Sequence, residues 1–179
     1  AEQKELAKNY WLLSADVLGY SKRPDKVSET FDQIQKKFGA DDAILQRLGD
    51  WLKSQGEYDK ARIEYAKFEN KIEGNNQIAY SFRQEQKWEQ AVGAYTRNLA
   101  LDQDNQVRWN QQIAESWRDG RKIPQAVAVY RELIASDPDR GNLALECRLH
   151  LPPLRWQLQG SHWFVPPVQQ FSEQPSTDG

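Results

Sequence analysis

Three residues near the C-terminus are of the types that could do metal or nucleophilic chemistry. They are Cys147, His150 and His162, which are the single cysteine and the only two histidines of the chain. Thiolate and imidazole groups bind zinc, but this spacing fits no established zinc site and no fourth ligand is evident. A Cys–His nucleophile pair lacks the electropositive setting that activates a thiol. We therefore expect no metal, no cofactor and no catalytic residue.

The many carboxylates have a spacing that indicates helix surface and not acid–base chemistry. Glu57 precedes Lys60, Asp59 precedes Arg62 and Glu64 precedes Lys67, each by three residues. Charges of opposite sign at this spacing are neighbours on a helix and are usually solvated. No glycine-rich phosphate loop occurs in the sequence. The sequence predicts that the protein is not an enzyme.

The composition predicts a folded domain and excludes some partners. The chain has 179 residues, of which 39% are hydrophobic and 28% charged, and its net charge is −2. This balance gives no broad attraction to nucleic acid, and no apolar run approaches the roughly 20 residues of a membrane span. The chain contains no Met. Ala1 therefore fits either a mature end left by signal-peptide cleavage, with a periplasmic or secreted location, or an excised fragment of a cytoplasmic protein.

One pattern of apolar and small residues occurs twice between Asn76 and Pro138. An apolar residue followed by Ala is followed by an aromatic residue, a polar turn, a second Ala and a Tyr. The two copies are 35 residues apart, a period that indicates helical hairpins repeated along the chain. The first copy is Ile78-Ala79, Phe82, Ala91 and Tyr95; the second is Ile113-Ala114, Trp117, Ala126 and Tyr130.

Two earlier hairpins extend the array, and together they resemble a known family. Leu48-Gly49, Leu52, Tyr58, Ala61, Tyr65 and Phe68 resemble the tetratricopeptide signature, and Trp11, Ser14-Ala15, Leu18, Val27, Phe31 and Ile34 resemble it more weakly. The anchors Val27, Ala61, Ala91 and Ala126 are 34, 30 and 35 residues apart, against a family period of about 34. The resemblance covers residues 8–140 and implies an all-α solenoid of about four antiparallel hairpins.

The array departs from its period in two places, and its C-terminal end changes in composition. We expect the 30-residue step to shorten the connection around Glu73–Asn76, and the turn Asp119–Lys122 to carry one extra residue. A capping helix is predicted over about Gly141–Leu151. We therefore divide the chain into a repeat domain, residues 1–151, and a Pro- and aromatic-rich irregular tail, residues 152–179. Within the tail the alternation around Leu158 suggests extended backbone.

The aromatic residues divide into core and surface candidates. Eight of them fall on packing positions and are predicted to lie in the core: Tyr58, Tyr65, Phe68, Phe82, Trp88, Tyr95, Trp117 and Tyr130. Trp51, Tyr80 and Trp109 are one or two places off those positions and are predicted to lie at the surface or in a groove.

The resemblance also implies where a partner binds. In tetratricopeptide proteins the first helices of successive hairpins line a concave groove, and here Leu12 and the following residues would face it: Asp16, Tyr20, Gln46, Asp50, Lys53, Asn76, Tyr80, Arg83, Gln111, Glu115 and Arg118. This polar set of mixed charge fits an extended peptide. Lys and Asn, which clamp chaperone tails in one branch of the family, are missing at the first two such pairs of positions, Leu12 with Asp16 and Gln46 with Asp50.

The expected function is a protein–protein interaction scaffold that binds a peptide or a partner surface in this groove. Two alternatives remain: a periplasmic scaffold of a polysaccharide, envelope or secretion assembly, with Tyr80 or Trp109 stacking on sugars, and an accessory or inhibitory module of an enzyme. The tail residues Trp156, Trp163 and Phe164 suggest a segment that docks in the groove, caps the last hairpin or serves as a linker. The oligomeric state is left open.

Overall fold

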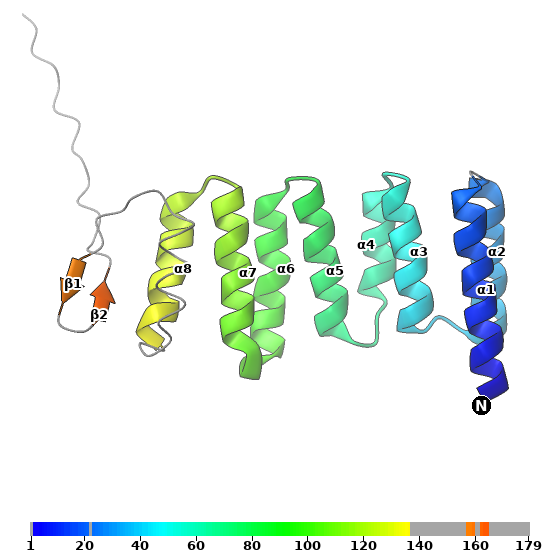
Figure 1. Ribbon diagram of the computed structural model, residues 1–179, viewed down its shortest axis with the longest axis horizontal. Helices are drawn as coiled ribbons and strands as arrows, with labels where there is room; N and C mark the ends of the chain where they lie inside the picture. Colours follow the sequence, from blue (N-terminus) through cyan, green and yellow to red (C-terminus); the bar gives the residue numbers. More distant parts are fainter. Residues whose placement is uncertain (1, 22, 137–156, 160–161, 165–179) are drawn as a thin grey trace, which may run out of the picture.

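The computed structural model describes residues 2–21, 23–136, 157–159 and 162–164. Within these residues the chain forms eight α-helices, one 3₁₀ turn and two short strands (Figure 1). Successive helices pair into four antiparallel hairpins that stack in sequence order along one axis, which confirms the predicted all-α solenoid. The elements are α1 (Glu2–Tyr20), α2 (Pro24–Phe38), α3 (Asp42–Ser54), α4 (Tyr58–Ala66), α5 (Lys71–Gln84), α6 (Trp88–Leu101), η1 (Gln103–Asn105), α7 (Gln106–Asp119), α8 (Ile123–Ser136), β1 (Gln157–Gln159) and β2 (His162–Phe164).

The last three hairpins turn through the same backbone geometry. Gly56, Gln86 and Arg121 occupy the same place in their turns, with φ of 79°, 59° and 59°. In each turn the following residue donates its N–H to the carbonyl five residues earlier, at 2.8 to 2.9 Å, which closes the helix with a left-handed cap. The turn after α7 therefore has no extra residue, and that prediction is wrong. The extra residue of this repeat lies between Ala91 and Ile113, a stretch that includes the connection through η1.

Small residues let the two helices of a hairpin approach closely, as the sequence predicts. A Cβ placed on Gly49 of α3 would lie 2.3 Å from the Tyr65 ring of α4 in the same hairpin. Gly120 allows a similar approach between hairpins, because a Cβ there would lie 2.9 Å from Trp88 of α6. The three alanines that anchor the repeats, Ala61, Ala91 and Ala126, are fully buried. Among the eight aromatic residues predicted as core, Tyr65, Phe68, Tyr95 and Tyr130 are buried. Tyr58, Phe82, Trp88 and Trp117 are half-buried.

The 30-residue spacing between Ala61 and Ala91 results from a short helix, α4, and not from a short connection around residues 73–76 as predicted. Residues 73–76 lie inside α5, whereas α4 ends at Ala66 after only 9 residues. Gly74 makes this possible, because a Cβ there would lie 2.5 Å from the Tyr65 carbonyl oxygen. The Asp42 carboxylate then accepts the backbone N–H groups of Glu69 and Asn70 at 2.7 and 3.0 Å. The second hairpin therefore ends early, and its last turn is replaced by side-chain hydrogen bonds.

The prediction that the paired charges of α4 are all solvated is wrong for Arg62. The three predicted i,i+3 ion pairs, Glu57–Lys60, Asp59–Arg62 and Glu64–Lys67, all form, but Arg62 itself is only 8% exposed. Its guanidinium donates to Ser81 Oγ at 2.8 Å, pairs with Glu85 and lies 4.1 Å from the centre of the Phe82 ring. Arg62 therefore joins α4 to α5 through a buried polar contact.

The first hairpin joins the second through a side chain at the N-terminal end of α3. Lys8 pairs with Asp41 at 2.8 Å, and Asp41 caps α3 by accepting the Ile44 N–H at 2.9 Å. Pro24 begins α2, as predicted. Leu12 is 5% exposed and belongs to the core of this hairpin, so its predicted place in the groove is wrong.

The C-terminal region is described only in part. The predicted capping helix, Gly141–Leu151, lies outside the described residues, as does Trp156. β1 and β2 pair antiparallel, with Leu158 opposite Trp163 and Gln157 opposite Phe164. This pairing agrees with the extended backbone expected around Leu158.

Candidate partner-binding groove

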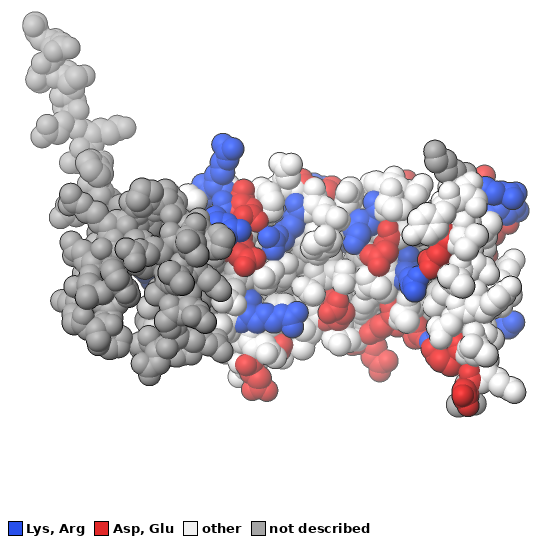
Figure 2. All heavy atoms as spheres, viewed as in Figure 1, with Lys and Arg blue, Asp and Glu red and all other residues white. Residues whose placement is uncertain are grey.

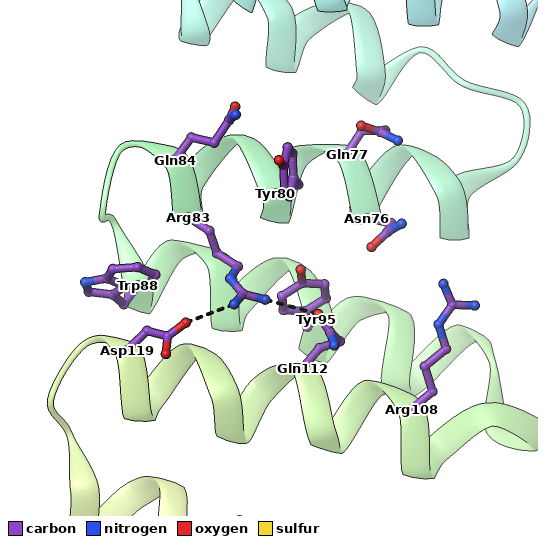
Figure 3. A pocket seen from close by; sticks show the side chains of 10 residues that line it. All are labelled: Asn76, Gln77, Tyr80, Arg83, Gln84, Trp88, Tyr95, Arg108, Gln112 and Asp119. Carbon is purple, nitrogen blue, oxygen red and sulfur yellow. Dashed lines mark hydrogen bonds and ion pairs between the residues drawn. The ribbon is translucent and has the colours of Figure 1, made fainter. Parts of the chain in front are cut away.

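A cleft of about 720 Å³ lies between the first helices of the last two hairpins, α5 and α7, with α6 beneath (Figure 3). Its two walls face each other because α5 and α7 both lie on the same side of the stack, above the second helices. Most of the lining residues carry a polar group, and they come from all three helices: Asn76, Gln77, Tyr80, Arg83 and Gln84 of α5; Trp88 and Tyr95 of α6; Arg108, Gln112 and Asp119 of α7.

Arg83 crosses the cleft and ties the two walls together. Its guanidinium donates to Gln112 Oε1 at 3.1 Å and to Asp119 Oδ2 at 2.9 Å, and Glu115 lies 3.6 Å away (Figure 3). Burial opposes the charge of Arg83, but the Tyr95 hydroxyl and the Asp119 carboxylate outweigh burial and raise its pKa. The charge of Arg83 is therefore already neutralised within the protein, and Arg83 positions α5 on α7.

Tyr95 lines the floor of the cleft and stacks on the buried Trp109, which holds the third hairpin against the fourth. The rings of Tyr95 and Trp109 stack with their centres 6.4 Å apart and their planes 25° apart. Trp109 is 1% exposed and donates its indole N–H to Asp102 at 3.0 Å. The prediction that Trp109 is a surface residue is therefore wrong. It lies four residues before Ile113, and this i,i+4 spacing on one helix face was the signal that could have placed it in the core.

Several polar groups of the cleft keep free hydrogen-bonding capacity. The side chains of Asn76 and Gln84 have no hydrogen bond to another described residue, and Gln77 only donates one, to Glu73. Arg108 lies over the Trp109 ring at 4.6 Å but has no ion pair within the described part of the chain. With Arg83 compensated by Asp119, Arg108 gives the cleft a surplus positive charge.

A second polar cluster joins α3 to α5 on the same side of the stack. Asp50 accepts hydrogen bonds from Gln46, Lys53 and the Tyr65 hydroxyl at 2.9 to 3.0 Å. Burial disfavours the Asp50 charge, but these three donors outweigh it and lower the Asp50 pKa. The Lys53 ammonium also lies 5.1 Å from the centre of the Tyr80 ring. Lys53 of α3 and Tyr80 of α5, which were both predicted to line the groove, therefore meet beside the short helix α4.

Two more predicted groove residues, Asp16 and Tyr20, line a second pocket together with Asp50, between α1 and α3. Asp16 pairs with Arg47 between α1 and α3, and Tyr20 is 88% exposed at the end of α1. Arg118 donates to Asp119 at the edge of the cleft. Gln111 does not line the cleft; its neighbour Gln112 does. The sequence therefore placed Asn76, Tyr80 and Arg83 in the cleft, and missed Gln77, Gln84, Arg108, Gln112 and Asp119.

The residues proposed for metal binding and for sugar stacking lie in different parts of the chain. Cys147 and His150 lie outside the described residues, and His162 lies in β2. Within the described part of the chain no group of three or more His, Cys, Asp or Glu side chains is arranged to hold a metal ion. Of the two aromatic residues proposed to stack on sugars, only Tyr80 is exposed, at 50%. None of the described helices has both the length and the apolar character needed to cross a membrane.

A comparison with known protein families agrees with the repeat assignment. The sequence pattern of the family described as tetratricopeptide repeat matches residues 76–108, which span most of the third hairpin and the start of α7. No curated protein matches the chain. Among solved structures, the APC/C hetero-tetramer Cut9–Hcn1 contains a similar chain, with 17% identity and a TM-score of 0.49 over 79% of this chain and 29% of that one. Residues 76–108 thus match a tetratricopeptide repeat, and they lie within four stacked helical hairpins of the kind that serve as interaction scaffolds.

Proposed function

We propose that the protein binds an extended peptide segment of a partner protein in the cleft between α5 and α7. The observation that supports this proposal is the set of uncommitted polar groups around a rigid floor. Asn76, Gln84 and Arg108 line the cleft without an internal hydrogen bond or ion pair among the described residues. The Tyr95–Trp109 stack beneath them is buried and fixed.

Amide side chains suit an extended peptide because each carries both a donor and an acceptor. The backbone of an extended peptide presents N–H and C=O groups along its length, and a side-chain amide can pair with both. From Asn76 to Gln84 the α5 wall is about 12 Å long, which corresponds to roughly four peptide residues. The cleft therefore fits a short linear segment held by several backbone hydrogen bonds.

The surplus charge of Arg108 selects among such peptides. Asp119 and Glu115 already offset Arg83 at one end of the cleft, whereas Arg108 at the other end faces Asn76 and forms no close ion pair with any described residue (Figure 3). A carboxylate placed between these two residues would form a charge-assisted hydrogen bond. The expected ligand is a peptide with an acidic residue near the Asn76 end.

A displayed library of random peptides tests the proposal. Peptides enriched on the wild-type protein should contain Asp or Glu, and their affinity, measured by fluorescence polarisation, should fall at least about 30-fold in the double variant Asn76→Ala/Arg108→Ala. Gln90→Ala, an exposed change on α6, is the matched control and should leave the affinity unchanged. Enriched peptides that bind the double variant as tightly as the wild type would refute binding in this cleft.

A further inference from the structure

Helix α1 has a second apolar face opposite the one that packs in the core. Its buried residues are Lys8, Leu12 and Ala15. The other face carries five large side chains with high exposure: Leu6 (72%), Tyr10 (71%), Leu13 (60%), Val17 (56%) and Tyr20 (88%). A helix that is apolar on both sides normally has a partner on both sides. We call these five residues the α1 seam.

The seam has the spacing of a helix–helix interface. Its members are separated by four, three, four and three residues, which is the repeat that keeps one stripe of a helix facing a partner helix. Together they expose on the order of 700 Å², close to the roughly 800 Å² that each protein contributes to a stable interface of standard size. The seam is therefore large enough to sustain association without help from other surfaces.

The five seam residues are all exposed in the described structure. Helix α1 belongs to the first of the four hairpins and packs on α2 and α3 (Figure 1). In the space-filling view this end of the molecule shows a broad uncharged surface with acidic residues near its foot (Figure 2). Ala7 and Ser14 flank the seam, and their short side chains allow a second helix to approach.

We propose that the seam binds the seam of a second copy of this chain, with the two α1 helices antiparallel. A two-fold axis at Leu13 places Leu6 of one copy beside Tyr20 of the other, and Tyr10 beside Val17. Each large aromatic side chain then meets a smaller aliphatic one. A parallel pair would instead place Tyr20 against Tyr20 and Glu2 against Glu2. The antiparallel pair forms a closed dimer through one self-complementary patch.

The charges at the two ends of the seam favour the same arrangement. Glu2 lies at the start of α1 and Arg23 just beyond its end, and neither has an ion pair within the described part of the chain. In the antiparallel dimer Glu2 of each copy approaches Arg23 of the other. Two complementary contacts of this kind set the direction of the pair more than its affinity.

The mass of the chain in solution tests the proposal directly. Sedimentation over a concentration series should give about twice the monomer mass of 20.8 kDa at the upper concentrations. Leu13→Lys places two ammonium groups at the two-fold axis and should weaken dimerisation at least about 30-fold. Ile63→Lys, a change at a similarly exposed apolar residue on α4, is the control and should leave the dimer intact. Circular dichroism should show that both variants remain folded.

Cysteine cross-linking in a Cys147→Ser background tests the orientation. Leu13→Cys should form a disulfide-linked dimer with itself. Leu6→Cys should cross-link poorly with itself but efficiently when mixed with Tyr20→Cys. A monomeric mass at every concentration would overturn the proposal, as would a dimer that Leu13→Lys does not affect. Efficient self-linking of Leu6→Cys would overturn the antiparallel arrangement.

Discussion

The two junctions between the last three hairpins join the same repeated motif by different physical means. Between α4 and α5 the chain is shortened, and the contact depends on Gly74, on the Asp42 carboxylate and on the buried guanidinium of Arg62. Between α6 and α7 the chain has its full length, and the contact depends on the stacked rings of Tyr95 and Trp109. Both junctions belong to one apolar core cluster, and at the shortened one buried polar contacts are added to it.

This difference also decides where the cleft forms. At the full-length junction the floor is apolar and rigid, so polar side chains on α5 and α7 can remain available above it. At the shortened junction the groove-facing residues Asp50, Lys53 and Gln46 bond to one another. The candidate partner-binding site is therefore concentrated at one junction, although the sequence assigns residues of similar type to both.

The largest effect is expected from removing the aromatic floor. Trp109→Ala deletes a buried ring and its hydrogen bond to Asp102, and should lower the free energy of unfolding by about 3 to 5 kcal/mol. Tyr80→Ala removes a half-exposed ring and should change it by less than about 0.5 kcal/mol. Urea denaturation of both variants measures the difference. Equal effects would mean that Trp109 does not support the core beneath the cleft.

A methyl group on Gly74 tests the close approach at the shortened junction. Gly74→Ala should destabilise the protein by about 2 kcal/mol, because the added Cβ meets the Tyr65 carbonyl oxygen at 2.5 Å. Gly93, inside α6, has no atom within 4 Å of a Cβ placed on it. Gly93→Ala should therefore stabilise the protein by about 0.5 to 1 kcal/mol. Thermal denaturation should move in opposite directions for the two variants, and a shift in the same direction would contradict this account.

Loss of the Arg62 contact should lower the free energy of unfolding by as much as Gly74→Ala or slightly less. Arg62→Met preserves most of the side-chain volume but leaves Glu85 and Ser81 without their buried donor, so we expect a loss of roughly 2 kcal/mol. Lys60→Met removes an exposed partner at the same helical spacing and should cost less than about 0.5 kcal/mol. Denaturant titration of the two variants distinguishes a buried junction from a solvated ion pair.

The smallest expected effect is a change in the dependence of stability on pH. Burial alone would raise the Glu85 pKa, but hydrogen bonds from Lys87 and Arg62 outweigh burial and lower it. A lowered carboxylate pKa contributes stability above its unfolded value, near 4.5, and this contribution is lost as the pH falls through the folded value. Glu85→Gln should therefore lose less stability than the wild type between about pH 5 and pH 3. Identical pH profiles would exclude Glu85 as a contributor.

Side-chain spacing was sufficient to predict most of the fold. The interval between the alanine anchors predicted the hairpins, and Gly49 and Ala61 predicted their close packing, because these signals depend on local periodicity and on side-chain size. The location of the shortened turn was not predictable from spacing alone. The same deletion fits a shorter loop or a shorter helix, and the choice depends on Gly74 meeting the end of α4 across the junction.

The sequence by itself determined the helices, the order of the hairpins and three of the residues that line the cleft, Asn76, Tyr80 and Arg83. Only the tertiary structure decided that Trp109 lies in the core, that Arg62 is buried and that Arg83 is neutralised whereas Arg108 is not. Helical periodicity fixes which residues share a face of one helix. Which of those faces is buried, and which charges meet, depends on neighbouring helices that are distant in the sequence.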